Sequence, residues 1–454
     1  MTEEVSLSSV LACPRCGRGP VTLGRAGWMC DACSSGYPVI GDIAWLFADP
    51  RQSLAEWRGR LGMLAEHLAA EAAAMRAAVP AAAVDATRRR LEHVAAAYED
   101  QIARLKALLA PLGIEPGASP ATHQGLGTKL PLQQGLTNYY VNLHRDWCWG
   151  DDENARGLDE VRAALGGSLA GLGRTLVHGA GAGRLAYDLH AGGDASLTVA
   201  TDFNPLLLFV ARELFAGRGV GLWEFPIAPR GIEDHAVLRE LTAPPRPRPG
   251  LELVAADALQ PPFADGAFDT VVTPWFVDII GEPFARVAAR VNLLLKPGGR
   301  WINTGSLAFS RAAHADRVGL DEVLELMPRA GFSTPAVRTA TLPYMRSPSS
   351  RHSRLEEVVT WVATKSGAPT ESPRARVVPD WLLNAEKPVP RTPAFEMQAI
   401  SSRVHAFMLA LINGERSMRD MARVLADQRL LPPNESEAAV RAFLTRLHEE
   451  TDTL

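Results

Sequence analysis

Long hydrophobic runs are missing from this chain of 454 residues, in which no apolar stretch reaches the roughly 18 residues that a membrane span needs. The first residues, Met1-Thr-Glu-Glu4, also lack the basic start and apolar core of a secretory signal peptide. We therefore expect a cytoplasmic protein without a membrane segment.

A large excess of charge of either sign is missing too. Lys and Arg number 47 against 51 Asp and Glu, so the formal net charge is -4, and the pI is near 6.3. This balance argues against a strongly basic surface for nucleic acid, although a local basic patch remains compatible with it. The length predicts about three domains, and the hydrophobic content of 47% is ample for packed cores.

Cysteine is scarce, and four of the five cysteines fall in two Cys-x-x-Cys pairs, Cys13 with Cys16 and Cys30 with Cys33. Thiolates at this spacing close a tetrahedral zinc site in a segment too short to fold without a metal. We predict a zinc ribbon over residues 1–50, with a structural zinc because four sulfur ligands leave no open position. The alternative, a pair of redox thiols, needs an oxidoreductase context that this chain lacks.

What the chain does have is a run of alternating glycines inside an apolar segment, Thr175-Leu-Val-His-Gly-Ala-Gly-Ala-Gly-Arg-Leu185. The pattern predicts the first strand and loop of a Rossmann-like nucleotide-binding unit, followed by a helix over 184–192. The glycines let the backbone approach a ligand, while the helix presents free N–H groups. A dinucleotide fingerprint would have glycine where this chain has Arg184, so the spacing favours S-adenosylmethionine over NAD.

Two later strands are each followed by a carboxylate. The strand over 197–202 ends at Asp202, placed to bind a ribose diol, and a third strand leads to Asp257, placed to meet an adenine amino group. The apolar strand over 268–273 is typical of a parallel sheet covered on both faces. A helix end, a Pro-Gly-Gly turn and another strand follow over 293–303. Each acid alone is more often a solvated strand end, but the ordered set predicts an α/β fold with a class I methyltransferase sheet.

Several motifs narrow the assignment further. Val177–Ala186, Thr201–Asn204, Val272–Asp278 and Trp301–Gly305, preceded by Arg145-Asp146-Trp147, resemble the consecutive motifs of the carnosine N-methyltransferase family over residues 136–365. The resemblance implies an S-adenosylmethionine-dependent methyltransferase in which Asp278 holds the imidazole of the substrate and Arg145 lies near the cofactor carboxylate. The expected cofactor-binding residues are Arg145, Gly179, Gly181, Gly183, Arg184, Asp202, Phe203, Asp257, Ala258 and Trp275.

The chain departs from this family around the expected substrate pocket. Where the family follows its Asp278 equivalent with Thr-Ala-His-Asn, this chain has Ile279-Ile-Gly-Glu282. Where the family has a Tyr-His pair, this chain has Phe309-Ser310. Because those side chains help to shape the family's pocket, the resemblance carries over cofactor binding more firmly than substrate identity.

The chemistry that these residues would serve is an in-line displacement. The enzyme must hold a neutral nucleophile about 3 Å from the methyl carbon and exclude water. A carboxylate bonded to one imidazole N–H fixes the tautomer and leaves the lone pair of the other nitrogen free. Asp278 ends the fourth strand, where such sheets place substrate, with a helix cap as the alternative. Asn303 and Tyr344 are further candidates for hydrogen bonds to substrate.

Helical segments flank the expected catalytic domain of residues 136–365. Residues 51–135 predict amphipathic helices with a break at Pro80, then a loop over 113–135. We favour packing of these helices on the catalytic domain; the alternative is a coiled arm that forms a homodimer. Ahead of them, Tyr37–Phe47 resembles the strand pair that follows small zinc ribbons fused to methyltransferases.

The segment 366–454 predicts a linker and then a small helix-turn-helix unit. A helix from His405 meets an Asn-Gly turn, a second helix is capped by Ser417, and a third covers 436–449. The pattern resembles the winged-helix elements that bind precursor peptides in peptide-modifying pathways. A packing domain is an equal alternative, and DNA binding is less favoured because the second helix has few base-reading side chains.

Three functions remain in view. The favoured one is N-methylation of a histidine-like imidazole in a small molecule or peptide, with S-adenosylmethionine as donor. The second is a zinc-ribbon RNA base methyltransferase, which needs a basic face joining the ribbon to the cleft. The third is a non-catalytic scaffold, which predicts no cofactor binding despite the intact glycine loop and acids.

Overall fold

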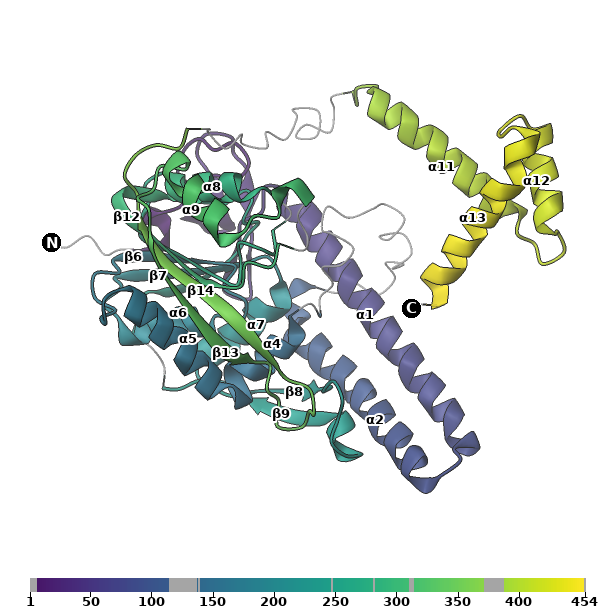
Figure 1. Cartoon of the computed structure of the whole chain (residues 1–454), viewed down its shortest axis with the longest axis horizontal. Coiled ribbons are helices and arrows are strands. Elements are labelled where there is room, and N and C mark those ends of the chain that lie inside the picture. Colours follow the sequence, from purple (N-terminus) through teal and green to yellow (C-terminus); the bar gives the residue numbers. More distant parts are fainter. Residues whose placement is uncertain are drawn as a thin grey trace. The chain divides into compact units, whose positions relative to one another are not determined.

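A computed structural model of the chain describes residues 6–113, 137, 139–245, 248–280, 282–309, 314–370 and 388–452 (Figure 1). The chain divides into two compact units, Met1–Val377 and Val378–Leu454. The finer boundaries expected at 50, 135 and 365 remain predictions. The loop expected over 113–135 lies, from residue 114 on, outside the described residues. In the parts that are described, no helix combines the length and apolarity that crossing a bilayer takes.

A mixed sheet of nine strands forms the centre of the first unit. Six neighbouring strands, from β12 to β5, run parallel, while β14 and β13 add an antiparallel edge on one side and β4 adds one on the other. From β6 the chain builds outward to β7 and β10 on one side and to β11 and β12 on the other. In spatial order the strands are β13 (Ala336–Tyr344), β14 (Arg354–Thr364), β12 (Leu295–Gly305), β11 (Phe268–Pro274), β6 (Arg174–His178), β7 (Leu197–Asp202), β10 (Leu251–Ala255), β5 (Ile43–Trp45) and β4 (Val39–Ile40).

This order creates a topological switch point between β6 and β11, where doubly wound sheets bind ligands at the carboxyl ends of their strands. The predicted sites after β6, β7, β10 and β11 therefore share one edge of the sheet. The Rossmann-like methyltransferase fold expected from the sequence is confirmed, with strand 197–202 and helix 184–192 at their predicted positions.

Helices cover both faces of the sheet, as the apolar strands require. One core joins the sheet to α8 and α9, and another joins it to α5 and α6. A third contains α7, α4 and the N-terminal helices (Figure 1). The helices are α4 (Tyr140–His144), α5 (Asp151–Ala164), α6 (Arg184–Gly192), α7 (Pro205–Phe215), α8 (Phe284–Leu294) and α9 (Leu320–Arg329), with short turns η5 (Glu233–His235) and η6 (His314–Asp316).

The four-cysteine segment forms its own three-stranded sheet and then joins the central one. The hairpin β4–β5 continues the central sheet, because β5 pairs in parallel with β10 at Ala44 and Trp45. The segment also contacts the unit directly, since the N–H of Ala264 donates to the carbonyl of Val10. Its elements are η1 (Leu7–Ser9), β1 (Val21–Gly24), β2 (Gly27–Cys30) and β3 (Gly36–Tyr37).

Two long helices, α1 (Pro50–Ala78) and α2 (Asp85–Leu108), follow as a hairpin, and Pro80 lies in the turn between them. The turns are η2 (Val79–Ala81) and, after α2, η3 (Ala110–Leu112). Trp57 and Leu105 belong to the core that also contains α7, so the hairpin packs on the first unit. Whether it also forms a homodimer remains a prediction.

A second hairpin, β8 (Val220–Glu224) and β9 (Val237–Leu241), lies between α7 and β10 and was not expected from the sequence. Helix α2 holds it through Gln101, whose amide oxygen accepts the N–H of Trp223 at 3.0 Å and whose amide nitrogen donates to the hydroxyl of Tyr140 at 2.7 Å. This hairpin therefore connects the N-terminal helices to α4.

The second unit contains helices α11 (Pro393–Leu411), α12 (Met418–Asp427) and α13 (Pro433–Asp452). Ser417 caps α12 as predicted, since its hydroxyl accepts the N–H of Asp420 at 3.2 Å. Residues 388–452 contain no strand, so the hairpin of a winged helix is not seen in this part, and the winged-helix assignment remains a prediction.

Candidate active site

The glycine loop after β6 has the backbone that its sequence predicts. Gly179, Gly181 and Gly183 have φ values of +67°, +58° and +79°, which residues other than glycine rarely adopt. A Cβ at Gly179 would collide with Phe276, and one at Gly183 would collide with Phe215. A Cβ at Gly181 would meet nothing within 4 Å. The loop is therefore packed at its two ends and open at its centre.

Asp202 faces this loop from the end of β7. Its carboxylate accepts the N–H of Gly181 at 2.8 Å and the N–H of Asn204 at 2.9 Å. Burial raises the pKa of Asp202 to about 6, although these backbone donors work against the rise. A buried carboxylate held by the glycine loop suits the predicted contact with ribose hydroxyls. Phe203 is half-buried beside it.

The end of β10 supplies the next part of the edge. Asp257 accepts the N–H of Leu259 at 2.8 Å, and both Asp257 and Ala258 are half-buried. The carbonyl of Ala258 lies 3.3 Å from Nε2 of His178, whose Nδ1 lies 2.8 Å from the hydroxyl of Thr201. Burial lowers the pKa of His178 to about 4, so the ring is neutral and serves to link these strands.

The Arg-Asp-Trp element forms η4 (Arg145–Trp149), a π-helical turn, and contacts the glycine loop. The indole of Trp147 donates to the carbonyl of Ala182 at 3.0 Å. Arg184 donates to the carbonyl of Asp146 at 2.6 Å and pairs with Asp188 at 2.9 Å. Arg184 therefore connects the Arg-Asp-Trp element to α6. Its contact with the cofactor remains a prediction.

Three predicted residues meet around one aromatic ring. Tyr344, at the end of β13, packs against Trp275 with ring centroids 4.5 Å apart, and the guanidinium of Arg145 lies 4.9 Å from the Tyr344 ring. Arg145 also pairs with Asp146 at 2.6 Å. Burial by itself lowers the pKa of the Arg145 guanidinium. The negative charge of Asp146 has the opposite effect, and the pKa is raised overall. The tertiary structure therefore brings together residues from three predicted motifs.

Asp278 is buried at 3% exposure, just after β11. One oxygen accepts the hydroxyl of Ser306 at 2.6 Å and the N–H of Ala308 at 2.9 Å. The other oxygen has no hydrogen-bond partner within the residues that the structure describes. The helix-cap alternative is wrong, because Pro283 occupies the N-cap position of α8. A fixed carboxylate with one free oxygen is suited to accept a hydrogen bond from a substrate.

Asn303 is placed differently. It is 1% exposed within β12; its amide oxygen accepts the hydroxyl of Thr273 at 3.0 Å, and its amide nitrogen donates to the carbonyl of Val359 at 3.3 Å. Each amide atom keeps capacity for a further hydrogen bond, but the side chain is almost fully buried within the sheet. Its role as a substrate ligand remains a prediction.

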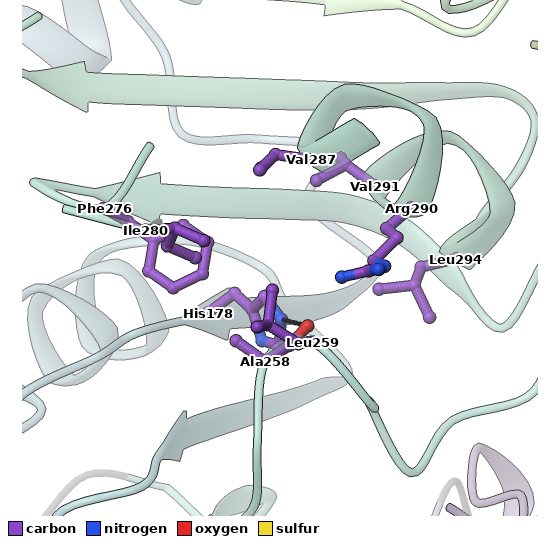
Figure 2. A pocket seen from close by; sticks show the side chains of 9 residues that line it. All are labelled: His178, Ala258, Leu259, Phe276, Ile280, Val287, Arg290, Val291 and Leu294. Carbon is purple, nitrogen blue, oxygen red and sulfur yellow. Dashed lines mark hydrogen bonds between the residues drawn. The ribbon is translucent and has the colours of Figure 1, made fainter. Parts of the chain in front are cut away.

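A small pocket opens beside this edge, between α8 and the loops after β10 and β11 (Figure 2). His178 and Arg290 supply its polar groups, and the other lining side chains are apolar, including Phe276 and Ile280. Arg290 forms an ion pair with Glu282 at 3.0 Å, and both side chains are largely buried. Glu282, one of the residues that depart from the family pattern, is therefore held by α8. At the other departure, Phe309 packs against Phe284, and Ser310 lies outside the described residues.

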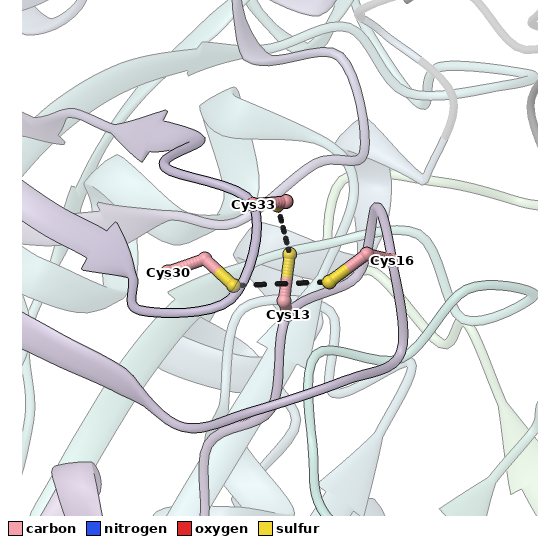
Figure 3. Close-up of side chains that lie close together, drawn as sticks. All are labelled: Cys13, Cys16, Cys30 and Cys33. Atoms are coloured by element: carbon pink, nitrogen blue, oxygen red, sulfur yellow. Dashed lines mark hydrogen bonds between the residues drawn. The ribbon is translucent and has the colours of Figure 1, made fainter. Parts of the chain in front are cut away.

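The two cysteine pairs converge as their spacing predicts (Figure 3). The sulfur atoms of Cys13 and Cys33, and those of Cys16 and Cys30, lie 3.7 Å apart, and all four lie within 4.8 Å of one another. Zn–S bonds of about 2.3 Å at tetrahedral angles place sulfurs about 3.8 Å apart, whereas a disulfide needs about 2.0 Å. The arrangement fits a metal ion.

Some residues of the site were not found from the sequence. Ser306 and Ala308 hold Asp278, and the carboxylate of Glu153 on α5 accepts the N–H groups of Met345 and Arg346 after Tyr344. Among these residues, only Ser306 lies next to a motif identified in the sequence, because it directly follows Trp301–Gly305. The other contacts join segments that are distant in the sequence.

Comparison with known proteins agrees with this geometry. A family model described as a methyltransferase domain matches residues 176–303, which run from β6 into β12. A carnosine N-methyltransferase from Dictyostelium discoideum is 27% identical over 157 residues, or 31% of this chain. The match spans 33% of that relative's length.

Solved methyltransferase structures match this chain at low similarity. The N-methyltransferase NodS from Bradyrhizobium japonicum, in complex with S-adenosyl-L-homocysteine, is 16% identical, with a TM-score of 0.33, and the match covers 51% of this chain and 100% of that one. Phosphoethanolamine N-methyltransferase 2 from Haemonchus contortus, in complex with S-adenosyl-L-methionine, is 15% identical with a TM-score of 0.31, over 47% of this chain and 53% of that one.

The family match and the observed sheet, glycine loop and strand-end acids lead to one assignment. The chain contains a methyltransferase domain that includes residues 176–303, and this match supports S-adenosylmethionine as its methyl donor.

Proposed function

We propose that this enzyme methylates a nitrogen of a histidine-like imidazole in a small molecule or a peptide. The observation that carries the proposal is the carboxylate of Asp278, with one oxygen held by Ser306 and Ala308 and the other without a partner in the described part of the chain. The local likeness to a carnosine N-methyltransferase supports an imidazole acceptor. The substituted segment Ile279–Glu282 argues that the acceptor differs from carnosine.

The free oxygen of Asp278 determines what the site does with such a ring. It accepts the N–H of the imidazole, so that the tautomer is fixed and the lone pair of the other nitrogen stays free. Bound S-adenosylmethionine supplies the electrophilic methyl group on its sulfonium sulfur. The nitrogen lone pair forms the new N–C bond while the C–S electron pair leaves with sulfur, and the resulting imidazolium then releases its N–H proton to solvent. Asp278 favours this path because it stabilises the positive charge that develops on the ring.

Mass spectrometry tests the proposal. Histidine, small imidazole compounds and histidine-containing peptides are incubated with the full chain and methyl-labelled cofactor. We expect label on an imidazole nitrogen of at least one of them. Label that appears only on RNA, with binding that weakens steeply as salt rises, would favour the alternative base methyltransferase. Matched histidine-free peptides serve as the control.

We further propose that Cys13, Cys16, Cys30 and Cys33 hold a structural zinc ion. Their closely placed sulfur atoms support it, and a closed set of four sulfur ligands gives the metal no catalytic position. Metal analysis of the purified chain should find zinc, and a strong chelator should lower its melting temperature. A chain that is metal-free and equally stable would contradict the assignment.

Binding of a precursor peptide by the second unit remains a prediction based on the helix pattern of residues 393–452. Homodimerisation and a cytoplasmic location also remain predictions.

A further inference from the structure

Trp57 on α1 is fully buried, but its indole N–H has no acceptor within the described chain. Burying an N–H without an acceptor is unfavourable. Four other indoles have an acceptor: those of Trp45, Trp147, Trp223 and Trp301 donate to Ser53, Ala182, Asp100 and Thr273. Two more buried indole N–H groups, those of Trp149 and Trp361, also lack an acceptor within the described chain, so what distinguishes Trp57 is its position.

The surroundings of Trp57 define this position. Its ring centroid lies 5.9 Å from that of Phe203, the residue after Asp202. On α1 itself the guanidinium of Arg60 lies 5.4 Å from the Trp57 ring, and Arg60 is 7% exposed. Trp57 therefore packs directly behind a side chain of the predicted cofactor edge.

The start of α1 is held at this edge by the sheet. Because β5 runs parallel to β10, its carboxyl end points to the same edge as Asp202. Asp49 then caps α1 by accepting the N–H of Gln52 at 3.0 Å, and the indole of Trp45 donates to Ser53 at 2.8 Å. These bonds fix the first turns of α1, including Trp57, beside the cofactor edge.

We propose that Trp57 is a cofactor-binding residue whose indole N–H donates to an acceptor atom on the adenosine part of S-adenosylmethionine. Phe203 is half-buried between Trp57 and the cofactor edge, and the proposal requires its ring to shift so that the ligand reaches the Trp57 N–H. The N-terminal segment then supplies one wall of the cofactor site as well as the four-cysteine site. This inference rests on placing the cofactor between the glycine loop and Asp202.

The variant Trp57→Phe tests the proposal, because it keeps an aromatic ring and removes the N–H. Calorimetry on the full chain measures binding of S-adenosylhomocysteine and of methylthioadenosine, which lacks the amino-acid part. We expect both affinities to fall by about 3- to 10-fold, the range of one hydrogen bond. The smaller ring leaves a cavity in the core, so the melting temperature without ligand should fall, and binding is measured at a temperature at which the variant is folded. A purely structural role would weaken binding equally in a variant that loses an equally buried indole elsewhere in the core.

Trp361→Phe is the matched control. Trp361 is also fully buried with an indole N–H that has no partner in the described chain, but it packs on Trp301 and Phe284, in the core on the α8 face. We expect no change in affinity there. Unchanged affinity in Trp57→Phe would overturn the proposal, as would a loss seen only with S-adenosylhomocysteine or an equal loss of affinity in both variants. If Asp202→Ala also leaves binding unchanged, the placement of the cofactor itself is wrong.

Discussion

The two sides of the site are held in different ways. On the proposed cofactor side, both oxygens of Asp202 accept backbone N–H groups, from Gly181 and Asn204. On the proposed acceptor side, one oxygen of Asp278 is held by Ser306 and Ala308, and the other has no partner among the described residues. The first carboxylate is part of a backbone network, whereas the second keeps an oxygen available.

This difference separates two tasks. A cofactor that is the same in every turnover can be bound by backbone groups, whose positions follow from the strand and loop. An acceptor is distinguished by side chains, which differ here from the carnosine family pattern at Ile279–Glu282 and Phe309. We therefore expect changes on the cofactor side to act on cofactor affinity and changes on the acceptor side to act on turnover.

The largest effect should come from Asp278→Asn. The amide keeps the shape of the side chain but loses the negative charge that orients and stabilises the imidazole. We expect kcat to fall by about 10²- to 10⁴-fold, while the Kd of S-adenosylmethionine stays within a few-fold of its original value. Steady-state kinetics with an identified acceptor and calorimetry measure the two quantities. An equal loss of both would assign Asp278 to folding and remove the distinction between the two sides.

Asp202→Ala should act on the cofactor side. Loss of charge-assisted hydrogen bonds to ribose hydroxyls should cost about 1.5–3 kcal/mol, or about 10- to 150-fold in Kd. Asp194→Ala is the matched control, because Asp194 also accepts two backbone N–H groups, from Gly171 and Leu172, and lies near the opposite ends of the strands. An unchanged Kd in Asp202→Ala would refute the ribose assignment.

The pH dependence of cofactor binding should reveal the same residue. Since Asp202 has a pKa of about 6 in the unliganded fold, cofactor affinity should fall below pH 6, by at most about tenfold per pH unit. Stability without ligand should respond in the opposite direction. A carboxyl whose folded pKa is raised above its ordinary 3.8 contributes stability at low pH that is lost as pH rises from 3.8 to 6. Calorimetric titrations across this range, repeated with Asp202→Asn, would show whether the pH dependence disappears with the titrating group.

The smallest effect should come from Ser306→Ala. Two hydrogen bonds, from Ser306 and Ala308, hold one carboxylate oxygen of Asp278. The change removes the bond from Ser306 and leaves the one from the N–H of Ala308. We expect a loss of about 1 kcal/mol, seen as a roughly fivefold lower kcat with unchanged cofactor affinity. A change in cofactor affinity without a change in kcat would place Ser306 on the other side of the site.

Much of the fold could be predicted because its information is local. The glycine spacing and the apolar runs predicted the strand before Gly179, the helix 184–192 and the strand 197–202, which the structure shows. The sequence predicts a Pro-Gly-Gly turn ahead of a strand, whereas in the structure this segment lies inside β12. It appears there as a shift in the pairing of β12 with β11, since Phe268 pairs with Leu295 but Thr270 pairs with Arg300. The pairs after the shift are regular, so the predicted strand itself is present.

Other features could not be predicted because they depend on pairing between distant segments. Nothing local indicates that β5 extends the central sheet beside β10, or that β8 and β9 form a hairpin held by Gln101. The stacking of Trp275, Tyr344 and Arg145 likewise unites three motifs far apart in the chain. Resemblance to a family indicated that these residues matter, but their mutual contacts appear only in the folded chain.

The amino-acid sequence by itself determined the strands and helix next to the glycine loop, the loop itself, the strand-end acids and the two cysteine pairs, because turn chemistry, hydrophobic pattern and ligand spacing act over a few residues. Only the tertiary structure decided that Asp202 has both oxygens held while Asp278 has one free, that Arg184 holds the Arg-Asp-Trp element, and that Trp57 lies behind Phe203. These are outcomes of burial and of hydrogen bonds between distant segments, which exist only when the whole unit is packed.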